Sequence, residues 1–283
     1  MTGFLNWWQH LPEKMDPVIF QIGFFKLQYY GMMYLVAFAL TYYLVLLRIR
    51  REDRFNASVH QVQDLVTYMI IGLIIGARLG YVLFYNLSYY LSHPLEAVLP
   101  FQFSNGIHFT GISGMSYHGG LIGTLLATFM FIKKSGLNFW EITDLFAPVI
   151  PLGYTFGRLG NFINGELYGR PTSAPIGMYF PQAPGKDPRH PSQLYEAFFE
   201  GIFLFLVLWH MRKLKRPPGG AMLAFYLIGY GLARFMIEYF RQPDAHLGFV
   251  LLSFSMGQIL SGAMILCGIC LYVYLARKRR GQA

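Results

Sequence analysis

Three arginines lie inside long apolar stretches of this sequence: Arg78, Arg158 and Arg234. A guanidinium in hydrocarbon costs at least about 2.5–3.5 kcal/mol on insertion scales and does not shed its charge by losing a proton. When the chain is threaded through a bilayer, all three fall near the same end of their stretches. Because the natural anion in a bilayer is a lipid phosphate, the pattern predicts an enzyme or carrier that handles a phospholipid headgroup.

Two of these arginines have polar neighbours at helical spacing. Asn161 follows Arg158 by three residues, and Glu238 follows Arg234 by four, so each pair can share one helix face. Tyr230 extends the second stripe by another turn. The plainer alternative is that Arg234 and Glu238 form a structural ion pair inside the membrane.

The polar residues of these stretches carry more positive than negative charge. The cations are Arg78, Arg158, Arg234 and Arg241, and the carboxylates counted near them are Glu166 and Glu238. A monoanionic phosphodiester would balance the excess through charge-assisted, bidentate hydrogen bonds. The alternative for Arg158 alone is a tie that fixes a kinked helix end.

His118 is the candidate general base, because histidine takes up a proton near neutral pH. It precedes Gly119 and Gly120, which are expected to leave room for a substrate. The alternative is a histidine hydrogen-bonded at a helix start. A second histidine, His190, stands before Pro191 at an expected helix start, where a capping role is at least as reasonable as catalysis.

These side chains must be positioned by membrane helices. Hydrophobic residues make up 54% of the chain, charged residues only 13%, and the mean hydropathy is +0.38. Such a balance predicts an all-α polytopic membrane protein forming a single integral membrane domain. About seven stretches are long enough to cross a bilayer of roughly 30 Å. They are residues 24–47, 64–85, 119–132, 141–161, 194–211, 221–240 and 255–276, of which the fourth is interrupted by two prolines.

The orientation follows from the basic residues in the connections. Most of the 23 lysines and arginines follow the first, third, fifth and seventh spans. The positive-inside rule then places the N-terminus outside and the C-terminus in the cytoplasm, so the arginines face outward. The proline-rich residues 162–190 are expected to form a small outer loop or cap between spans four and five. The net charge of +9 is read as a topology signal, and no motif indicates nucleic-acid binding.

Other classes fit less well. Cys267 and Cys270 lack neighbouring ligands, so no metal site is expected. The sequence GISG at 111–114 suggests an intramembrane serine protease, but its serine lies only five residues from His118 rather than on a separate helix. A phospholipid carrier or scramblase without covalent chemistry would explain the arginines, but it predicts polar residues in the inner half of the spans, where we find none comparable.

Four sequence blocks resemble the bacterial prolipoprotein diacylglyceryl transferases: HGG at 118–120, GRLGNFINGE at 157–166, RHPSQLYE at 189–196 and YG..R...E..RQPD at 230–244. The resemblance implies an inner-membrane enzyme with its active site toward the periplasm and no metal or cofactor. It implies transfer of the sn-1,2-diacylglyceryl group from phosphatidylglycerol to the lipobox cysteine of a preprolipoprotein signal peptide, forming a thioether and releasing glycerol-1-phosphate. The other expected partners are membrane lipids.

The resemblance also carries over site residues. They are Tyr30, His118, Arg158, Asn161, Glu166, Gly169, Tyr230, Arg234, Glu238 and Arg241, to which the charge argument adds Arg78. We expect Arg158 and Arg234 to hold the phosphate and to stabilise charge on the departing oxygen. A free thiol is a poor nucleophile near neutral pH, so His118 is expected to act as the base, although the arginine field could suffice.

Overall fold

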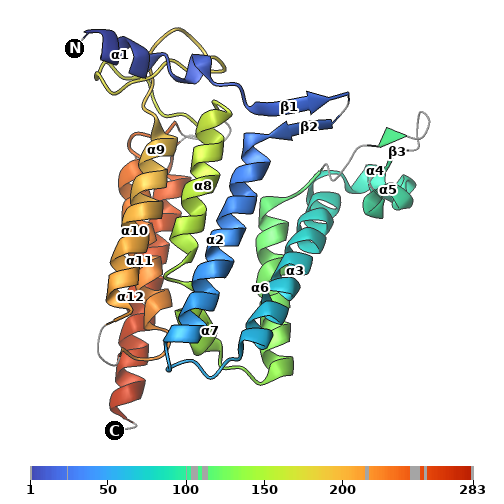
Figure 1. The fold of residues 1–283 in the computed structure, drawn as a ribbon, viewed down its shortest axis with the longest axis vertical. Coiled ribbons are helices and arrows are strands. Elements are labelled where there is room, and N and C mark those ends of the chain that lie inside the picture. Colours follow the sequence, from blue (N-terminus) through green and yellow to red (C-terminus); the bar gives the residue numbers. More distant parts are fainter. Residues whose placement is uncertain are drawn as a thin grey trace. The chain divides into compact units, whose positions relative to one another are not determined.

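The computed structural model describes residues 2–23, 25–99, 101–102, 108–109, 114–213, 217–242, 249–251 and 254–281, most of which are helical (Figure 1). A single domain was expected from the sequence. By its internal contacts the described chain divides into two compact units, Met1–Arg48 with Trp140–Ala283, and Ile49–Phe139, and the expectation of a single domain stays a prediction. Each unit is described by itself.

The first unit holds most of the helices. Its elements in chain order are α1 (Thr2–Gln9), η1 (Pro12–Lys14), β1 (Val18–Ile22), β2 (Phe25–Gln28), α2 (Tyr29–Arg51, whose last three residues belong to the second unit), α7 (Phe139–Phe146), α8 (Ile150–Ile163), α9 (Ser192–Glu196), η2 (Ala197–Phe203), α10 (Leu204–Met211), α11 (Ala221–Ile237), β5 (Phe249–Leu251), β6 (Phe254–Ser255) and α12 (Met256–Arg280). Strands β1 and β2 form an antiparallel hairpin, as do β5 and β6.

The second unit is built around two long helices. Its elements are α3 (Val59–Tyr85), α4 (Leu87–Ser92), α5 (Pro94–Val98), the paired strands β3 (Phe101–Gln102) and β4 (His108–Phe109), and α6 (Tyr117–Ser135). Ser58 and Gln61 form a reciprocal capping box that begins α3.

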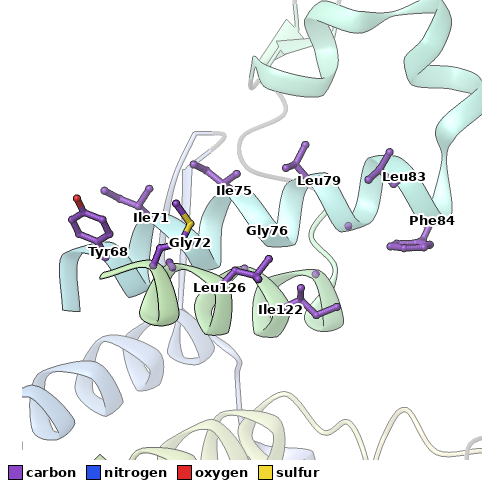
Figure 2. A pocket seen from close by; sticks show the side chains of 15 residues that line it. Tyr68, Ile71, Gly72, Ile75, Gly76, Leu79, Leu83, Phe84, Ile122 and Leu126 are labelled. Carbon is purple, nitrogen blue, oxygen red and sulfur yellow. The ribbon is translucent and has the colours of Figure 1, made fainter. Parts of the chain in front are cut away.

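Glycines bring α3 and α6 into close contact. A Cβ added at Gly80 would lie 2.7 Å from the Cα of Gly119, and one added at Gly123 would lie 2.8 Å from the Cα of Gly76. Small residues at this spacing let two helix backbones approach closely in a membrane. Beside this contact runs an apolar groove of about 490 Å³, walled by Ile75, Leu79 and other side chains (Figure 2).

Four described helices are long and apolar enough to cross a membrane. They are Tyr29–Arg51, Val59–Tyr85, Ser192–Met211 and Met256–Arg280, and Ala221–Ile237 is a shorter apolar helix. The third of these runs through α9, η2 and α10 without interruption. The first begins later than the predicted span 24–47, because residues Phe25–Gln28 pair with β1 instead. Apolar residues recur through that hairpin between Gln21, Lys26 and Gln28, so hydropathy alone does not separate strand from helix.

The chain between α7 and α8 breaks where the sequence places Pro148. α7 ends at Phe146, and α8 begins at Ile150 with Pro151 in its first turn, where a missing N–H costs least. α8 then packs on α2, since a Cβ on Gly153 would lie 2.8 Å from Thr41 Oγ1. The short helix α8 carries Arg158 at its centre.

A buried polar contact lies at the end of α2 opposite Tyr30. Arg48 is only 1% exposed and donates hydrogen bonds to the carbonyls of Asp144 and Leu145. The Asp144 carboxylate accepts from the amides of Gly220 and Met222, each at 2.9 Å, and so caps α11. The sequence places Arg48 among the cations that follow the first predicted span. We expected no polar group comparable with the three arginines in the inner half of the spans, and buried Arg48 shows that this expectation was wrong. Its hydrogen bonds to Asp144 and Leu145 go to backbone carbonyls.

Residues 164–191 form an ordered segment on which the N-terminal helix packs. Phe162, Met178 and Phe180 are buried together, and Trp8 packs against them. The Trp8 indole N–H donates to the carbonyl of Ile176 at 3.1 Å. The Trp8 side chain therefore anchors α1 to this segment.

Candidate functional site

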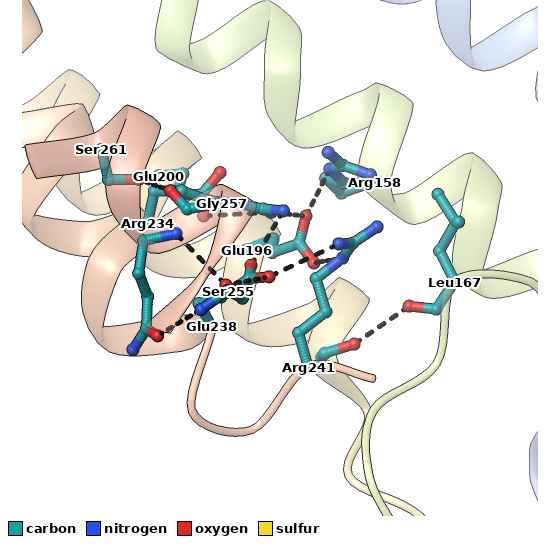
Figure 3. Close-up of polar contacts among 12 residues, drawn as sticks. Arg158, Leu167, Glu196, Glu200, Arg234, Glu238, Arg241, Ser255, Gly257 and Ser261 are labelled. Atoms are coloured by element: carbon teal, nitrogen blue, oxygen red, sulfur yellow. Dashed lines mark hydrogen bonds and ion pairs between the residues drawn. The ribbon is translucent and has the colours of Figure 1, made fainter. Parts of the chain in front are cut away.

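Six charged side chains of the first unit converge in one place (Figure 3). The Tyr154 hydroxyl joins them through its hydrogen bonds with Arg158 and Glu200. Arg158 comes from α8, Glu196 from α9, Glu200 from η2, Arg234 from α11, and Glu238 and Arg241 from the residues that follow α11. We call these six residues and Tyr154 the ionic cluster.

Arg158 is held along one edge. Its Nε lies 2.8 Å from Glu196 Oε2 and donates to the Tyr154 hydroxyl at 2.6 Å, while its carbon CZ stands 4.8 Å from the centre of the Tyr154 ring. Its Nη1 donates to Asn161 Oδ1 at 3.3 Å, the contact expected from their spacing. The Arg158 side chain remains 18% exposed. One edge of the guanidinium is therefore fixed while part of the side chain stays accessible.

Arg234 and Glu238 form the ion pair that their spacing predicts. Arg234 Nη2 lies 3.1 Å from Glu238 Oε2, and Arg234 Nη1 lies 3.1 Å from Glu196 Oε2. Arg241 stands further off, with Nη1 3.8 Å from Glu238 Oε1. The Ser255 hydroxyl donates to Glu238 Oε1 at 3.0 Å.

Two carboxylates of the ionic cluster were missed by the sequence reasoning. Glu196 and Glu200 have no exposed surface, and the Tyr154 hydroxyl donates to Glu200 Oε2 at 2.6 Å. The cluster thus has three arginines and three glutamates, so the expected excess of positive charge was wrong. The missed signal was a pair of glutamates four residues apart inside an apolar span, which matches the spacing of Arg234 and Glu238 on the facing helix.

Exposure separates the two signs of charge. The side chains of Arg158, Arg234 and Arg241 are 18%, 14% and 12% exposed, whereas those of Glu196 and Glu200 are 0% exposed. The third carboxylate, that of Glu238, is 3% exposed, and Figure 3 shows the Glu196 carboxylate between Arg158 and Arg241. The accessible part of the cluster is therefore cationic although its formal charges balance.

Asn161 connects the cluster to Glu166. Asn161 Nδ2 donates to Glu166 Oε1 at 2.8 Å, and Asn164 Nδ2 donates to the same oxygen at 3.3 Å. Tyr30 packs on the backbone of α8, because a Cβ on Gly160 would lie 2.9 Å from its ring. The hydroxyls of Tyr30 and Tyr34 are 3.1 Å apart. Asn161 and Glu166 thus lie at the end of α8 that carries Arg158, and Tyr30 contacts the same turn of the helix at Gly160.

Gly169 lies at a close backbone approach. A Cβ there would come within 2.8 Å of the His190 carbonyl, and the Gly169 amide donates to that carbonyl at 2.8 Å. Gly169 also pairs with Arg241 across an isolated β-bridge. This position therefore tolerates only glycine and joins the 164–191 segment to the end of α11.

His190 has a structural setting. Its Nδ1 is 3.1 Å from the Tyr195 hydroxyl, and its ring packs edgewise on Phe240. Burial lowers the pKa of His190 from its ordinary value, which favours the neutral ring.

α9 begins at Ser192, as the sequence predicted. The rings of Tyr230 and Tyr154 meet edge to face, with their centres 5.8 Å apart.

His118 and Arg78 belong to the second unit. His118 is exposed in the first turn of α6. Ser116 rather than the histidine caps this helix, since its hydroxyl accepts from the Gly119 amide at 3.2 Å. The two glycines beside His118 do not leave room for a substrate as expected, because a Cβ on Gly120 would lie 2.9 Å from Leu73 Cδ1 and Gly119 meets α3.

Arg78 donates to backbone carbonyls of its own unit. Its Nε reaches the Ala97 carbonyl at 2.8 Å, its Nη1 reaches that of Gly114 at 3.3 Å, and its Nη2 reaches that of Glu96. Its CZ lies 5.1 Å from the centre of the Tyr90 ring. The serine of the GISG motif, Ser113, lies outside the described residues, as does Asp244 at the end of the last resemblance block. Cys267 and Cys270 are exposed on α12.

The fold and the site define a class: a helical membrane protein whose helices converge on a buried cluster of arginines and glutamates with a cationic accessible edge. Residues 17–274 match the family described as prolipoprotein diacylglyceryl transferase. The chain is 53% identical over 276 residues to the phosphatidylglycerol–prolipoprotein diacylglyceryl transferase of Chlorobaculum tepidum, covering 97% of this chain and 94% of the relative. Its identity to proteins of the same name is 47% for Bordetella avium, covering 95% and 98%, and 42% for Treponema denticola, covering 95% of each. The chain belongs to the prolipoprotein diacylglyceryl transferase family.

Proposed function

We propose that this chain transfers the sn-1,2-diacylglyceryl group of phosphatidylglycerol to the cysteine thiol in the lipobox of a preprolipoprotein. The observation that carries the proposal is the match to relatives at 42–53% identity over nearly their whole length, whose names state both substrates. The ionic cluster supplies the chemistry that a phosphodiester substrate needs.

The reaction is a displacement at carbon. The cysteine sulfur forms a bond to the glyceryl carbon, and the bond from that carbon to the phosphate oxygen breaks. The products are a thioether and glycerol-1-phosphate, and the thiol proton passes to a base. No redox change and no cofactor enter this balance.

Arg158 and Arg234 hold the phosphate in this proposal. Arg158 Nη2 donates no hydrogen bond within the described residues, and the side chains of Arg158 and Arg234 are 18% and 14% exposed. Charge that builds on the departing oxygen would be stabilised by these fixed donors. Glu238 and Asn161 orient them through the contacts at 3.1 and 3.3 Å.

The remaining predicted site residues are proposed to line the substrate. They are Tyr30, Arg78, Glu166, Gly169, Tyr230 and Arg241. His118 is the proposed base that takes the thiol proton, and its exposed ring, uninvolved in capping α6, is compatible with that role.

The proposed setting is the bacterial inner membrane. Seven spans, including α6, α11 and the α7–α8 pair, would place the N-terminus in the periplasm and the C-terminus in the cytoplasm. The site would then open toward the periplasm, with residues 162–190 as a small cap. The basic residues at the end of α12 support this orientation.

The test mixes purified protein, phosphatidylglycerol vesicles and a lipobox peptide, and reads the peptide mass. We expect a gain of one diacylglyceryl group, absent from a peptide whose cysteine is serine. Arg158→Ala should abolish the gain, because the headgroup loses its fixed cation. Retained turnover in that variant would exclude the phosphate clamp. Phosphatidylglycerol binding by the wild type without any transfer would favour a lipid carrier instead.

A further inference from the structure

Glu196 stands between three arginines that come from different parts of the first unit. Its Oε2 lies 2.8 Å from Arg158 Nε and 3.1 Å from Arg234 Nη1, and its Oε1 lies 3.8 Å from Arg241 Nε. The side chain has no exposed surface. Figure 3 shows its carboxylate between the guanidiniums of Arg158 and Arg241. It is therefore placed to act on the arginines and not on a substrate.

The convergence of these arginines needs a negative charge at that point. Like charges repel strongly where water is excluded, and a buried charge is tolerated only with a well-placed partner. Glu238 pairs with Arg234 and Arg241 but has no contact with Arg158 in the described structure. Without the Glu196 charge, Arg158 and Arg234 would move apart, because they share its Oε2.

The backbone around Glu196 fixes the carboxylate. The residue ends α9, and the π-helix η2 begins at the next residue, Ala197. The hydroxyl of Thr155 on α8 donates to the Ala197 carbonyl at 3.3 Å, and Gly201 leaves room for Thr155. π-helical turns occur frequently at functional sites, where they re-aim side chains. The irregular turn thus sets Glu196 against α8 at the level of Arg158.

We propose that Glu196 is a positioning residue for diacylglyceryl transfer. Its Oε2 holds the Nε edge of Arg158 and one Nη of Arg234, so that Arg158 keeps its Nη2 for the phosphate and Arg234 stays beside it. The inference rests on the proposed function, since it assigns Glu196 a role within that same reaction. Glu196 takes up no proton and forms no bond to the substrate.

Glu200 supplies a matched control. It is equally buried and lies one turn further along the same helical run, but the nearest atom of Arg234 is 3.8 Å away. The test compares the wild type with Glu196→Gln, Glu196→Asp and Glu200→Gln. For each protein, kcat and KM for the lipobox peptide, phosphatidylglycerol binding to vesicles and the thermal unfolding midpoint are measured.

We expect Glu196→Gln to lower kcat by about 100-fold, the size of effect that a displacement of about 1 Å produces, with a much smaller change in KM. Glu196→Asp keeps the negative charge but moves it away from the arginines, because the side chain is one methylene shorter. Its kcat should therefore lie between those of Glu196→Gln and the wild type. Glu200→Gln should lose clearly less kcat at a similar unfolding midpoint. Where Glu196→Gln does not fold, Glu196→Asp carries the test, with an expected kcat about tenfold below the wild type.

Three results would overturn the assignment. They are wild-type kcat in the Glu196 variants, equal losses in Glu196→Gln and Glu200→Gln, and a loss that only follows the fraction of unfolded enzyme. A wild-type protein that transfers nothing would instead overturn the proposed function, so the two failures are distinguishable.

Discussion

The Ser255 hydroxyl donates a hydrogen bond to Glu238 at 3.0 Å, and this contact joins the end of α11 to the start of α12. Ser255 is also the N-cap of α12, where its hydroxyl accepts from the Gln258 amide at 3.2 Å. One side chain therefore caps a helix and fixes the carboxylate that pairs with Arg234. The ionic cluster depends in this way on residues that never touch a phosphate.

Gly257→Ala should displace Glu238. The added Cβ would lie 2.7–2.9 Å from the Glu238 carboxylate atoms, closer than real Cβ contacts allow, while the helix itself favours alanine. Because the carboxylate must move, we expect transfer activity to fall about tenfold to 100-fold with little change in the unfolding midpoint. The matched control is Gly262→Ala on the same helix, where nothing lies within 4 Å. Equal activity of the two variants would show that Glu238 has room to adjust.

The sequence predicted the helical membrane class and the local polar pairs, because both follow from short-range spacing. Arg234 with Glu238, and Arg158 with Asn161, lie three or four residues apart, so helical geometry alone brings them together. Glu196 reaches Arg158 across 38 residues and Arg234 across another 38, and no local pattern encodes that convergence. The missing carboxylates explain why the predicted charge excess failed.

His118→Gln should abolish most transfer while leaving phosphatidylglycerol binding intact. Glutamine keeps polar atoms at the same place but does not take up a thiol proton near neutral pH. We expect a loss of about 100-fold to 10,000-fold in kcat, the range typical of a general base. Lipid binding to vesicles and peptide mass are measured on the same preparation. Wild-type turnover in His118→Gln would show that His118 is not the base and that the positive charge of the arginines is enough to favour the thiolate.

Asp144→Asn should destabilise the first unit without entering the chemistry. Both carboxylate oxygens accept from helix amides at 2.9 Å, and an asparagine NH₂ would face one of those donors. The free energy of unfolding should fall by about 1–3 kcal/mol, the penalty for a buried donor that is left without an acceptor. Thermal unfolding in detergent measures it, and Asp64→Asn, at a side chain that is 53% exposed, is the control. An unchanged midpoint for Asp144→Asn would mean that the cap of α11 contributes nothing to stability.

The glycines at the contact of α3 and α6 show a second limit of sequence reasoning. Gly119 and Gly120 were interpreted as space for a substrate, because a glycine beside a candidate base fits that role. The packing partner was Gly76 and Gly80, about 40 residues earlier in the chain, at the four-residue spacing that closely packed membrane helices use. A glycine can leave space for a substrate or let two helices approach closely. Only the matching four-residue spacing of glycines on both α3 and α6 distinguishes the second interpretation from the first.

Gly123→Ala tests this packing directly. The new Cβ would lie 2.8 Å from the Gly76 Cα, a backbone atom that moves only if the two helices separate. Overpacking of this kind costs about 1–3 kcal/mol, so the unfolding midpoint of the protein in detergent should fall. Gly262→Ala again serves as the control, since it adds the same methyl group to a helix where nothing lies within 4 Å. Gly123 stands more than one turn beyond His118. We therefore expect the folded fraction of Gly123→Ala to keep its KM for the lipobox peptide. Its kcat should fall only to the extent that the displaced α6 moves His118. A midpoint as high as that of Gly262→Ala would show that α3 and α6 do not depend on glycine for their approach.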